Sequence, residues 1–148
     1  ANLSKAELAG ANLTGAILIA TNLSEADLNG ADLSSADLTQ ADLTAANLEK
    51  VQLYSANLSK AVLSGANLAG ADLSKANLTD AALKDATLKD ALLDEASLFD
   101  ATSLELQQLA QAASLKKTIL MDGKPYDPLT HPEINRLRKA AGLPPFTS

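Results

Sequence analysis

Leucine recurs at every fifth position along the first hundred residues. It occupies all twenty central positions from Leu3 to Leu98, and Ala stands two residues before it except at Thr21 and Val51. Asn or Asp separates these two residues in twelve of the twenty units. In a helix, successive Leu side chains would step by about 140° and form no stripe. In a straight strand, an odd period would send them to opposite faces. The pattern therefore requires a regular bend.

The spacing within one unit predicts a short strand followed by a corner. Ala and Leu are two residues apart and share a face, while the polar residue between them points the other way. Ser, Thr, Gly and Lys fill the last two positions, which suits a surface turn. Bends in one sense wind the chain into coils with a Leu-filled interior, whose stacked strands pair in parallel. We therefore predict an all-β solenoid. Its predicted structural core includes Leu3, Leu23, Leu43, Leu48, Leu53, Leu58, Leu63 and Leu83.

Charges in the last position of each unit bear on the number of sides. Like charges directly opposite each other destabilise a sheet, and a three-sided coil would stack them. Four sides place opposite charges over each other in three pairs, against one repulsive pair, Asp80 with Asp100, and five sides fit about as well. The pairs expected for four sides are Lys5 with Glu25, Lys60 with Asp80 and Lys75 with Glu95.

The units ANLSK, ADLNG, ADLSS, ADLTQ, ADLTA and ANLEK resemble the pentapeptide-repeat family, whose consensus is A(D/N)LXX. The resemblance implies a right-handed quadrilateral parallel β-helix, here of about five coils. The Phe that the family often has at the central position is absent, so we expect a uniformly Leu and rather narrow core. We divide the chain into a repeat β-helix, residues 1–100, and a C-terminal helical cap and tail, residues 101–148.

Two helices are predicted in the tail. A capping box at Thr102–Glu105 opens one helix to about Ser114, and another at Thr130–Glu133 opens a second that ends near Gly142. The stretch SLKKTILMDG is similar to the segment that follows the repeats in family members from photosynthetic microbes.

Outward positions of the last repeats also suggest a role for the tail. Leu92 and Phe99 would be exposed on a bare solenoid, which suggests that the tail folds back over them. The basic residues Arg136, Arg138 and Lys139 either dock on the acidic body or form a solvated face, the commoner outcome.

Charge and composition exclude several classes of function. The net charge is −6, with −8 in residues 1–100 and +2 after them, so nucleic acid is not an expected ligand. The absence of Cys excludes disulfides and thiolate metal sites. There is no apolar run of membrane length and no signal peptide. We expect a cytoplasmic protein and no membrane partner, although the start at Ala1 leaves a removed targeting segment open.

Two groups of outward residues are candidate surfaces. Ile17 and Ile19, together with Leu3, form a possible contact surface on a first coil without a visible cap, so a homodimer through that coil is one expectation. The second group is an acidic belt in four successive units. Its carboxylates diverge, one to a face, so we expect them to be solvated and hydrogen-bonded to turn backbone rather than to bind calcium. The acidic belt consists of Asp27, Asp32, Asp37 and Asp42.

No catalytic constellation is present. The interior is filled, the exterior is convex, and the single histidine, His131, lies in a predicted capping box, where a structural role is expected. We expect no enzyme, no cofactor, no metal and no small-molecule substrate. The favoured function is a structural or protein-interaction module whose protein partner is unknown. The alternatives are an acidic DNA mimic that binds DNA gyrase, as some family members do, and an accessory domain of a longer chain.

Overall fold

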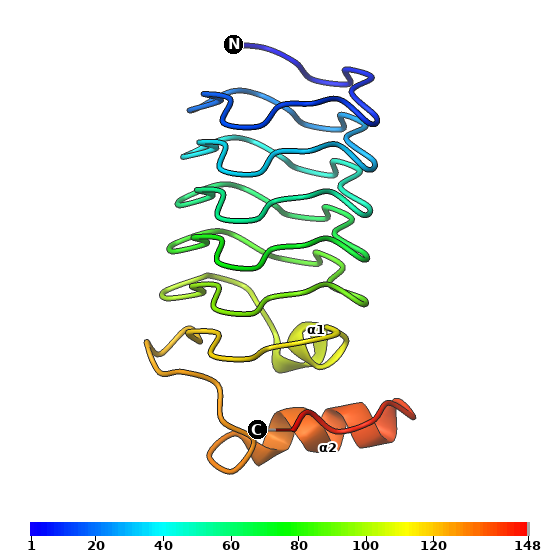
Figure 1. Ribbon diagram of the computed structural model, residues 1–148, viewed down its shortest axis with the longest axis vertical. Helices are drawn as coiled ribbons and strands as arrows, with labels where there is room; N and C mark the ends of the chain where they lie inside the picture. Colours follow the sequence, from blue (N-terminus) through cyan, green and yellow to red (C-terminus); the bar gives the residue numbers. More distant parts are fainter. Residues whose placement is uncertain (148) are drawn as a thin grey trace.

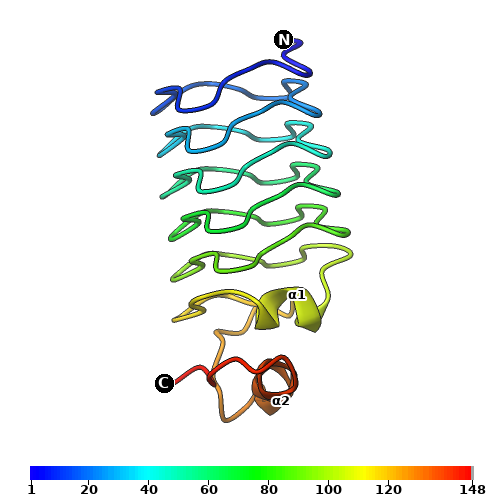
Figure 2. The same ribbon diagram turned by 90° about the vertical axis from the view of Figure 1, so that its right-hand side faces the viewer.

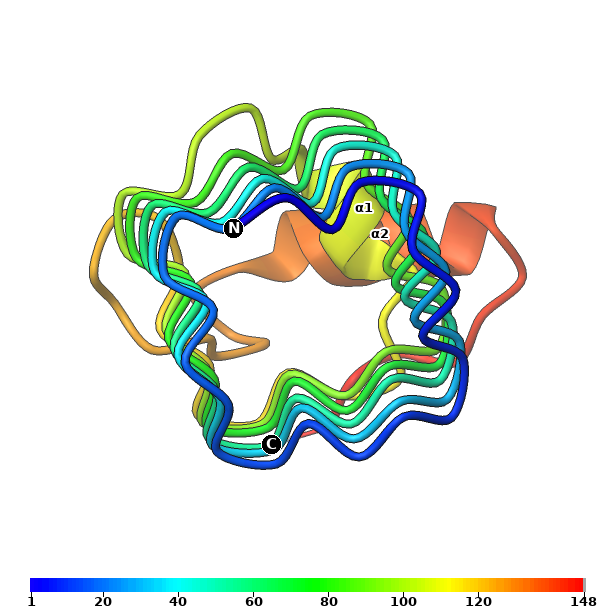
Figure 3. The same ribbon diagram turned by 90° about the horizontal axis from the view of Figure 1, so that it is seen from above.

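The computed structural model describes residues 1–147. Residues 1–100 form a stack of coils, and two short helices, α1 (Leu106–Ala110) and α2 (Pro132–Ala140), lie at the end of the stack distant from the N-terminus (Figures 1 and 2). Figure 3 shows the stack from its N-terminal end, where the chain runs clockwise as it recedes. The coil is therefore right-handed, and its outline has four sides.

Hydrogen bonds between residues twenty apart join each coil to the next. The middle residues of the units pair as parallel bridges, from Asn2 with Asn22 to Ala82 with Thr102. The Leu3 N–H donates to the Asn22 carbonyl at 2.7 Å, and the Asn22 N–H donates to the Ala1 carbonyl at 3.0 Å. With five residues in a unit, an interval of twenty places four units in each coil. A five-sided coil is thereby excluded.

The interior is filled by Leu and Ala. Leu23, Leu43, Leu48, Leu53, Leu58 and Leu63 have no exposed surface, and Leu83 is 1% exposed. Leu3 differs from the other residues predicted for the core, because it is only partly buried. Its coil packs against another coil on one side only, so its side chain keeps one face uncovered.

Each unit turns its corner at the fifth residue. All twenty of these residues, from Lys5 to Asp100, have a positive φ, between 51° and 68°, and fifteen of them are not Gly. The following N–H closes the turn, as when Ala6 donates to the Leu3 carbonyl at 3.1 Å. A residue with a Cβ atom pays about 1–2 kcal/mol for this left-handed conformation. A hydrogen bond to the next coil offsets this cost, because the N–H of the corner residue donates to a carbonyl there. The Lys5 N–H, for example, donates to the Ser24 carbonyl at 2.9 Å.

One of the three expected charge pairs forms an ion pair. The Lys5 ammonium lies 3.5 Å from the Glu25 carboxylate. Within residues 1–147 the other two pairs are not at ion-pair distance. The Lys75 ammonium instead lies 5.3 Å from the centre of the Tyr54 ring. These exposed charges therefore contribute little to the register, which the backbone sets.

The ladder continues past Asp100, and α1 takes the place of one strand in the next turn. Beyond α1 the interval between partners becomes 22 residues, as in the bridges of Leu92 with Ser114 and Ser97 with Ile119. The expected extent of the first helix, Thr102 to about Ser114, was therefore wrong. Thr102 stays in the ladder, where its N–H donates to the Ala81 carbonyl at 2.8 Å and its carbonyl accepts from Leu83 at 3.0 Å.

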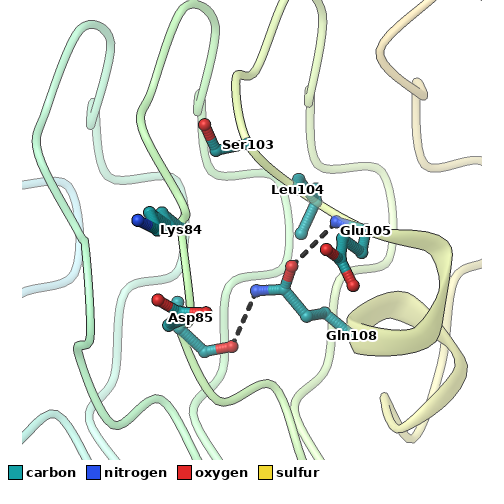
Figure 4. Close-up of a pocket in the computed structure, with 7 residues that line it drawn as sticks. Lys84, Asp85, Ser103, Leu104, Glu105 and Gln108 are labelled. Carbon is teal, nitrogen blue, oxygen red and sulfur yellow. Dashed lines mark hydrogen bonds between the residues drawn. The ribbon is translucent and has the colours of Figure 1, made fainter.

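A capping box does start α1, three residues later than expected. Glu105 is the N-cap, and the Gln108 side chain accepts a hydrogen bond from the Glu105 N–H at 2.7 Å. The Gln108 amide also donates to the carbonyls of Leu83 at 2.9 Å and Ala86 at 2.8 Å, and Figure 4 draws the second of these bonds. One side chain thus caps the helix and satisfies two coil carbonyls that face the helix instead of a strand.

The second helix, α2, ends where the sequence predicts. The Gly142 N–H donates to the Lys139 carbonyl and the Leu143 N–H to the Arg138 carbonyl, a Schellman motif with Gly142 at φ 72°. Its predicted capping box is absent: His131 is the N-cap and makes no side-chain cap bond. Helix α2 packs against α1.

The corner geometry predicts that neighbouring alanines respond oppositely to Gly. Ala45 is an exposed corner residue at φ 55°, whereas Ala46 is buried in the core. Ala45→Gly relieves left-handed strain but increases the entropy of the unfolded chain, so we expect it to raise the free energy of unfolding by about 0.5 kcal/mol. Ala46→Gly removes a buried methyl and should lower it by about 1–2 kcal/mol. Urea titrations followed by circular dichroism measure both changes. A loss of stability in both variants would contradict the account of the corner.

Candidate interaction surfaces

The outer surface of the solenoid is built from three positions in each unit. The middle residue points outward from each strand, and the last two form the corner, while Ala and Leu fill the interior. Residues twenty apart lie over each other, so every face carries columns of side chains. The solenoid interior therefore offers no concave site, and any contact in this part of the chain uses the convex exterior.

The acidic belt is spread around the coil. The ladder places Asp27 beside Asn47, Asp32 beside Gln52, Asp37 beside Asn57 and Asp42 beside Val62, and each of these four pairs lies on a different face. In residues 1–147, no group of three or more His, Cys, Asp and Glu side chains could hold a metal ion.

Each belt carboxylate accepts a hydrogen bond from the backbone two residues further on. The Asp37 carboxylate, for example, accepts from the Thr39 hydroxyl at 2.6 Å and the Thr39 N–H at 3.0 Å. These bonds lower the pKa of Asp37, and the hydroxyl and N–H of Ser34 lower the pKa of Asp32 in the same way. The belt side chains thus brace the turns that follow them. The four backbone donors are Asn29, Ser34, Thr39 and Thr44.

The predicted apolar contact surface lies on the first coil. Ile17 is 79% exposed and Ile19 is 48% exposed, whereas Leu3 is partly buried. Asp37 is the ladder partner of Ile17 in the next coil. Two exposed branched side chains thus stand next to a polar, charged column.

The expectation that the tail covers Leu92 and Phe99 was wrong in its extent. Leu92 remains 40% exposed and Phe99 remains 42% exposed. The tail pairs with their coil through the backbone, since the Leu93 N–H donates to the Ser114 carbonyl at 3.1 Å. It therefore extends the coil axially and leaves the outward side chains partly exposed, with the Phe99 ring beside the turn at Gly123.

One concave feature of the tail was not predicted from the sequence. A groove of about 690 Å³ lies between the last turn of the coil, the loop before α2 and the C-terminal segment. We call it the C-terminal groove. Its lining residues are 113–117, 125–129, 138 and 144–147. A second hollow of about 550 Å³ beside α1 is lined mainly by polar and charged residues, among them Lys84, Asp85, Glu105 and Gln108 (Figure 4).

Arg138 fixes α2 against the end of α1 and against the C-terminal segment. It is 5% exposed, and its guanidinium donates to the carbonyls of Ala110 at 2.8 Å, Ala112 at 2.7 Å and Pro144. The centre of the Phe146 ring lies 3.8 Å from the Cζ atom of Arg138. The expected solvated face is wrong for this residue, which is buried, and the expected docking on the acidic body takes another form, because Arg138 bonds backbone carbonyls of the tail. Its spacing of four from the buried Ile134 was the signal in the sequence.

The His131 side chain packs against neighbouring residues of the tail. Its Nδ1 lies 3.0 Å from the Thr130 hydroxyl and 3.2 Å from the Asp127 carbonyl, and its ring centre is 5.9 Å from that of Tyr126.

No described helix is long and apolar enough to cross a membrane.

The ladder, the Leu-filled interior and the left-handed corners define the class of protein: a repeat-built β-solenoid. The sequence matches the family model described as Pentapeptide repeats, with eight copies over residues 1–34, 21–59 and 56–94. The chain belongs to the pentapeptide-repeat family. No curated protein sequence matches it significantly.

Solved structures of the same family are similar to this chain. A pentapeptide repeat protein from the cyanobacterium Cyanothece is 34% identical, with a TM-score of 0.54, over 75% of this chain and 64% of that one. One from the Arabidopsis thaliana thylakoid lumen is 30% identical, with a TM-score of 0.51, over 64% and 63%. This chain thus spans less than two thirds of the length of either.

A third solved structure shares the fold alone. QnrB1, a plasmid-mediated fluoroquinolone resistance protein, is 18% identical to this chain and has a TM-score of 0.54. The match covers 99% of this chain and 85% of QnrB1.

The hydrogen bonds of the belt predict a dependence of stability on pH. The pKa of Asp37 is lowered from its ordinary 3.8 in the folded protein. Its stabilising effect is therefore complete above the unfolded-state pKa and is lost as the pH falls through the lower folded-state pKa. Asn keeps the accepting oxygen but does not titrate. We expect Asp37→Asn to lose less stability than the wild type between about pH 5 and pH 2.

Chemical denaturation at a series of pH values measures this difference. Asp80→Asn is the matched control, because in residues 1–147 the Asp80 side chain forms no hydrogen bond or ion pair. It removes the same charge and should keep the wild-type dependence. The same flattening in both variants would assign the effect to net charge and refute the role of the Thr39 bonds.

Proposed function

We propose that this chain is a non-enzymatic protein-interaction module, a solenoid of five coils closed by a C-terminal helical cap. The observation that carries this proposal is the exposure of Ile17, at 79%, on an exterior whose other outward positions are mostly polar. A backbone held by a continuous ladder keeps its side chains at fixed spacing, which favours recognition of a surface over binding of a substrate. As an accessory domain of a longer chain, the module would serve the same purpose.

The partner that we favour is a second copy of this chain. Ile17 and Ile19 provide two apolar anchors at one edge of the stack, and Leu3 adds a partly buried apolar side chain of the same coil. Apolar anchors with a polar rim are the usual anatomy of an interface, and Asp37 with its turn supplies such a rim beside Ile17. A twofold axis would bring the same residues together from both copies.

This proposal predicts a dimer in solution. Light scattering should give twice the mass of one chain, and Ile17→Asp should give the mass of a monomer, because a charge would be buried in the contact. Val62→Asp is the matched control: Val62 is an outward β-branched residue, 37% exposed, on another coil and face, and its variant should stay dimeric.

A monomeric wild type at all concentrations would refute the homodimer. A dimer that resists Ile17→Asp but not Val62→Asp would move the interface to the face of Val62.

The second candidate is an acidic mimic of DNA that binds DNA gyrase. The specific observation in its favour is charge: residues 1–100 carry fourteen acidic and six basic side chains, a net of −8, and the belt spreads four of the acids around the coil. A rod with charge on every side presents an anionic surface to a protein groove that takes a duplex. The likeness to QnrB1 is one of fold, so the charge is the argument here.

This candidate predicts that micromolar protein changes supercoiling by gyrase, in the presence or absence of a quinolone. Replacement of all four belt residues by Asn should abolish the effect, since Asn keeps the turn hydrogen bonds and removes the charge. Unchanged supercoiling with the wild type would eliminate gyrase as a partner.

A further inference from the structure

The C-terminal groove has the size and the walls of a small-molecule site. Its volume of about 690 Å³ lies within the range of about 300–1,000 Å³ usual for such sites. Most of its lining is apolar. The apolar side chains include Leu115, Pro125, Pro128, Leu129, Pro144, Pro145 and Phe146.

The groove holds an excess of positive charge on a protein that is acidic elsewhere. Arg138, Lys116 and Lys117 line it, and Asp127 is the one acidic residue among the described lining residues. The Asp127 carboxylate already accepts the Leu129 N–H at 2.8 Å. Charge complementarity therefore favours an anionic ligand.

The Arg138 guanidinium is a buried cation without a carboxylate. Within residues 1–147 its hydrogen bonds go to backbone carbonyls, through Nε and Nη1. Burial lowers the pKa of Arg138, which reflects the cost of removing this charge from water. Carbonyl dipoles offset only part of that cost, and an anion in the groove would offset more of it.

A second polar group, buried beside the groove, lacks a partner. Tyr126 lines the groove and is 8% exposed, and its hydroxyl is the one buried side-chain N or O atom without a hydrogen bond among the described residues. Burial raises the pKa of Tyr126, so the phenol stays protonated and can donate. A buried unpaired hydroxyl is costly, and a ligand oxygen would satisfy it.

We propose that the C-terminal groove binds a small amphipathic carboxylate, a molecule with an apolar body and one anionic head. The body lies along the proline and aromatic walls. The head lies at the cationic side, near the Tyr126 hydroxyl and Arg138. The site is independent of the interaction surface on the first coil, because it rests on residues of the tail alone.

Decanoate, below its micelle concentration, is the probe that tests this site. Titration into isotopically labelled protein should shift the amide signals of residues 113–117, 126, 127 and 129 and leave those of the first coils unchanged. Decanol has the same body without the charge and should bind at least about tenfold more weakly, the loss expected for a charge-assisted hydrogen bond. Equal binding of decanol, or decanoate shifts spread over the solenoid, would overturn the proposal.

Two variants separate a ligand site from a structural junction. Tyr126→Phe keeps the ring contacts with Phe146 and His131 and removes an unpaired hydroxyl, so the protein should stay folded while decanoate binds several-fold more weakly. Lys117→Glu should also weaken binding. Lys139→Glu, an equal charge change on an exposed residue of α2 outside the lining, is its control.

Arg138 is left intact in these tests because it also holds α2 against the end of α1 and the C-terminal segment. Unchanged decanoate affinity in Tyr126→Phe and in Lys117→Glu would refute the site. Binding of a peptide with a free C-terminal carboxylate, without binding of decanoate, would also refute it and would identify the groove as a peptide site.

Discussion

The interval of twenty residues between hydrogen-bonded partners is the constraint on which this structure depends. In residues 21–80, three N–H groups of each unit donate to neighbouring coils, including the N–H of the corner residue, which is held left-handed although it is usually not Gly. A shift of one residue would break these bonds and turn Leu side chains outward. The ladder therefore fixes the filled interior, the columns on each face and the positions of all outward groups together.

The solenoid could be predicted from the sequence because the residue spacing within one unit is enough to define the strand and the corner. Ala and Leu at a spacing of two share the inner face, and the central Leu of every unit from Leu23 to Leu98 is at most 2% exposed. The number of sides could not be derived from charges. Of the pairs expected for four sides, Lys5 with Glu25 lies at 3.5 Å, and the exposed Lys75 approaches the Tyr54 ring instead. Ion pairs between exposed side chains are too weak to indicate the register of the coils, which the backbone hydrogen bonds set.

The tail could be predicted only in outline, because the first residues of the tail form hydrogen bonds with the last coil instead of starting a helix. Thr102 has the right spacing from Glu105 to cap a helix, but its backbone completes the ladder with Ala81 and Leu83. The helix begins where the ladder is interrupted. Gln108 then bonds the coil carbonyls that α1 faces, and Arg138 bonds the carbonyls of Ala110 and Ala112 at the end of α1. These roles depend on acceptors that no local pattern reveals, although the spacing of Ile134 and Arg138 marks one face of α2.

This contrast also separates the two kinds of candidate surface. On the solenoid, an outward residue is interchangeable with those above and below it, and the belt carboxylates are engaged with their own turns, so a partner is recognised by a few exceptions such as Ile17. In the tail, the departure from the repeat brings together elements that the ladder would have kept apart. Among the residues that the structure describes, a buried guanidinium, an unpaired phenol and apolar walls meet only there. Chemistry specific to this chain, as opposed to its repeat, is therefore concentrated where the interval of twenty residues ends.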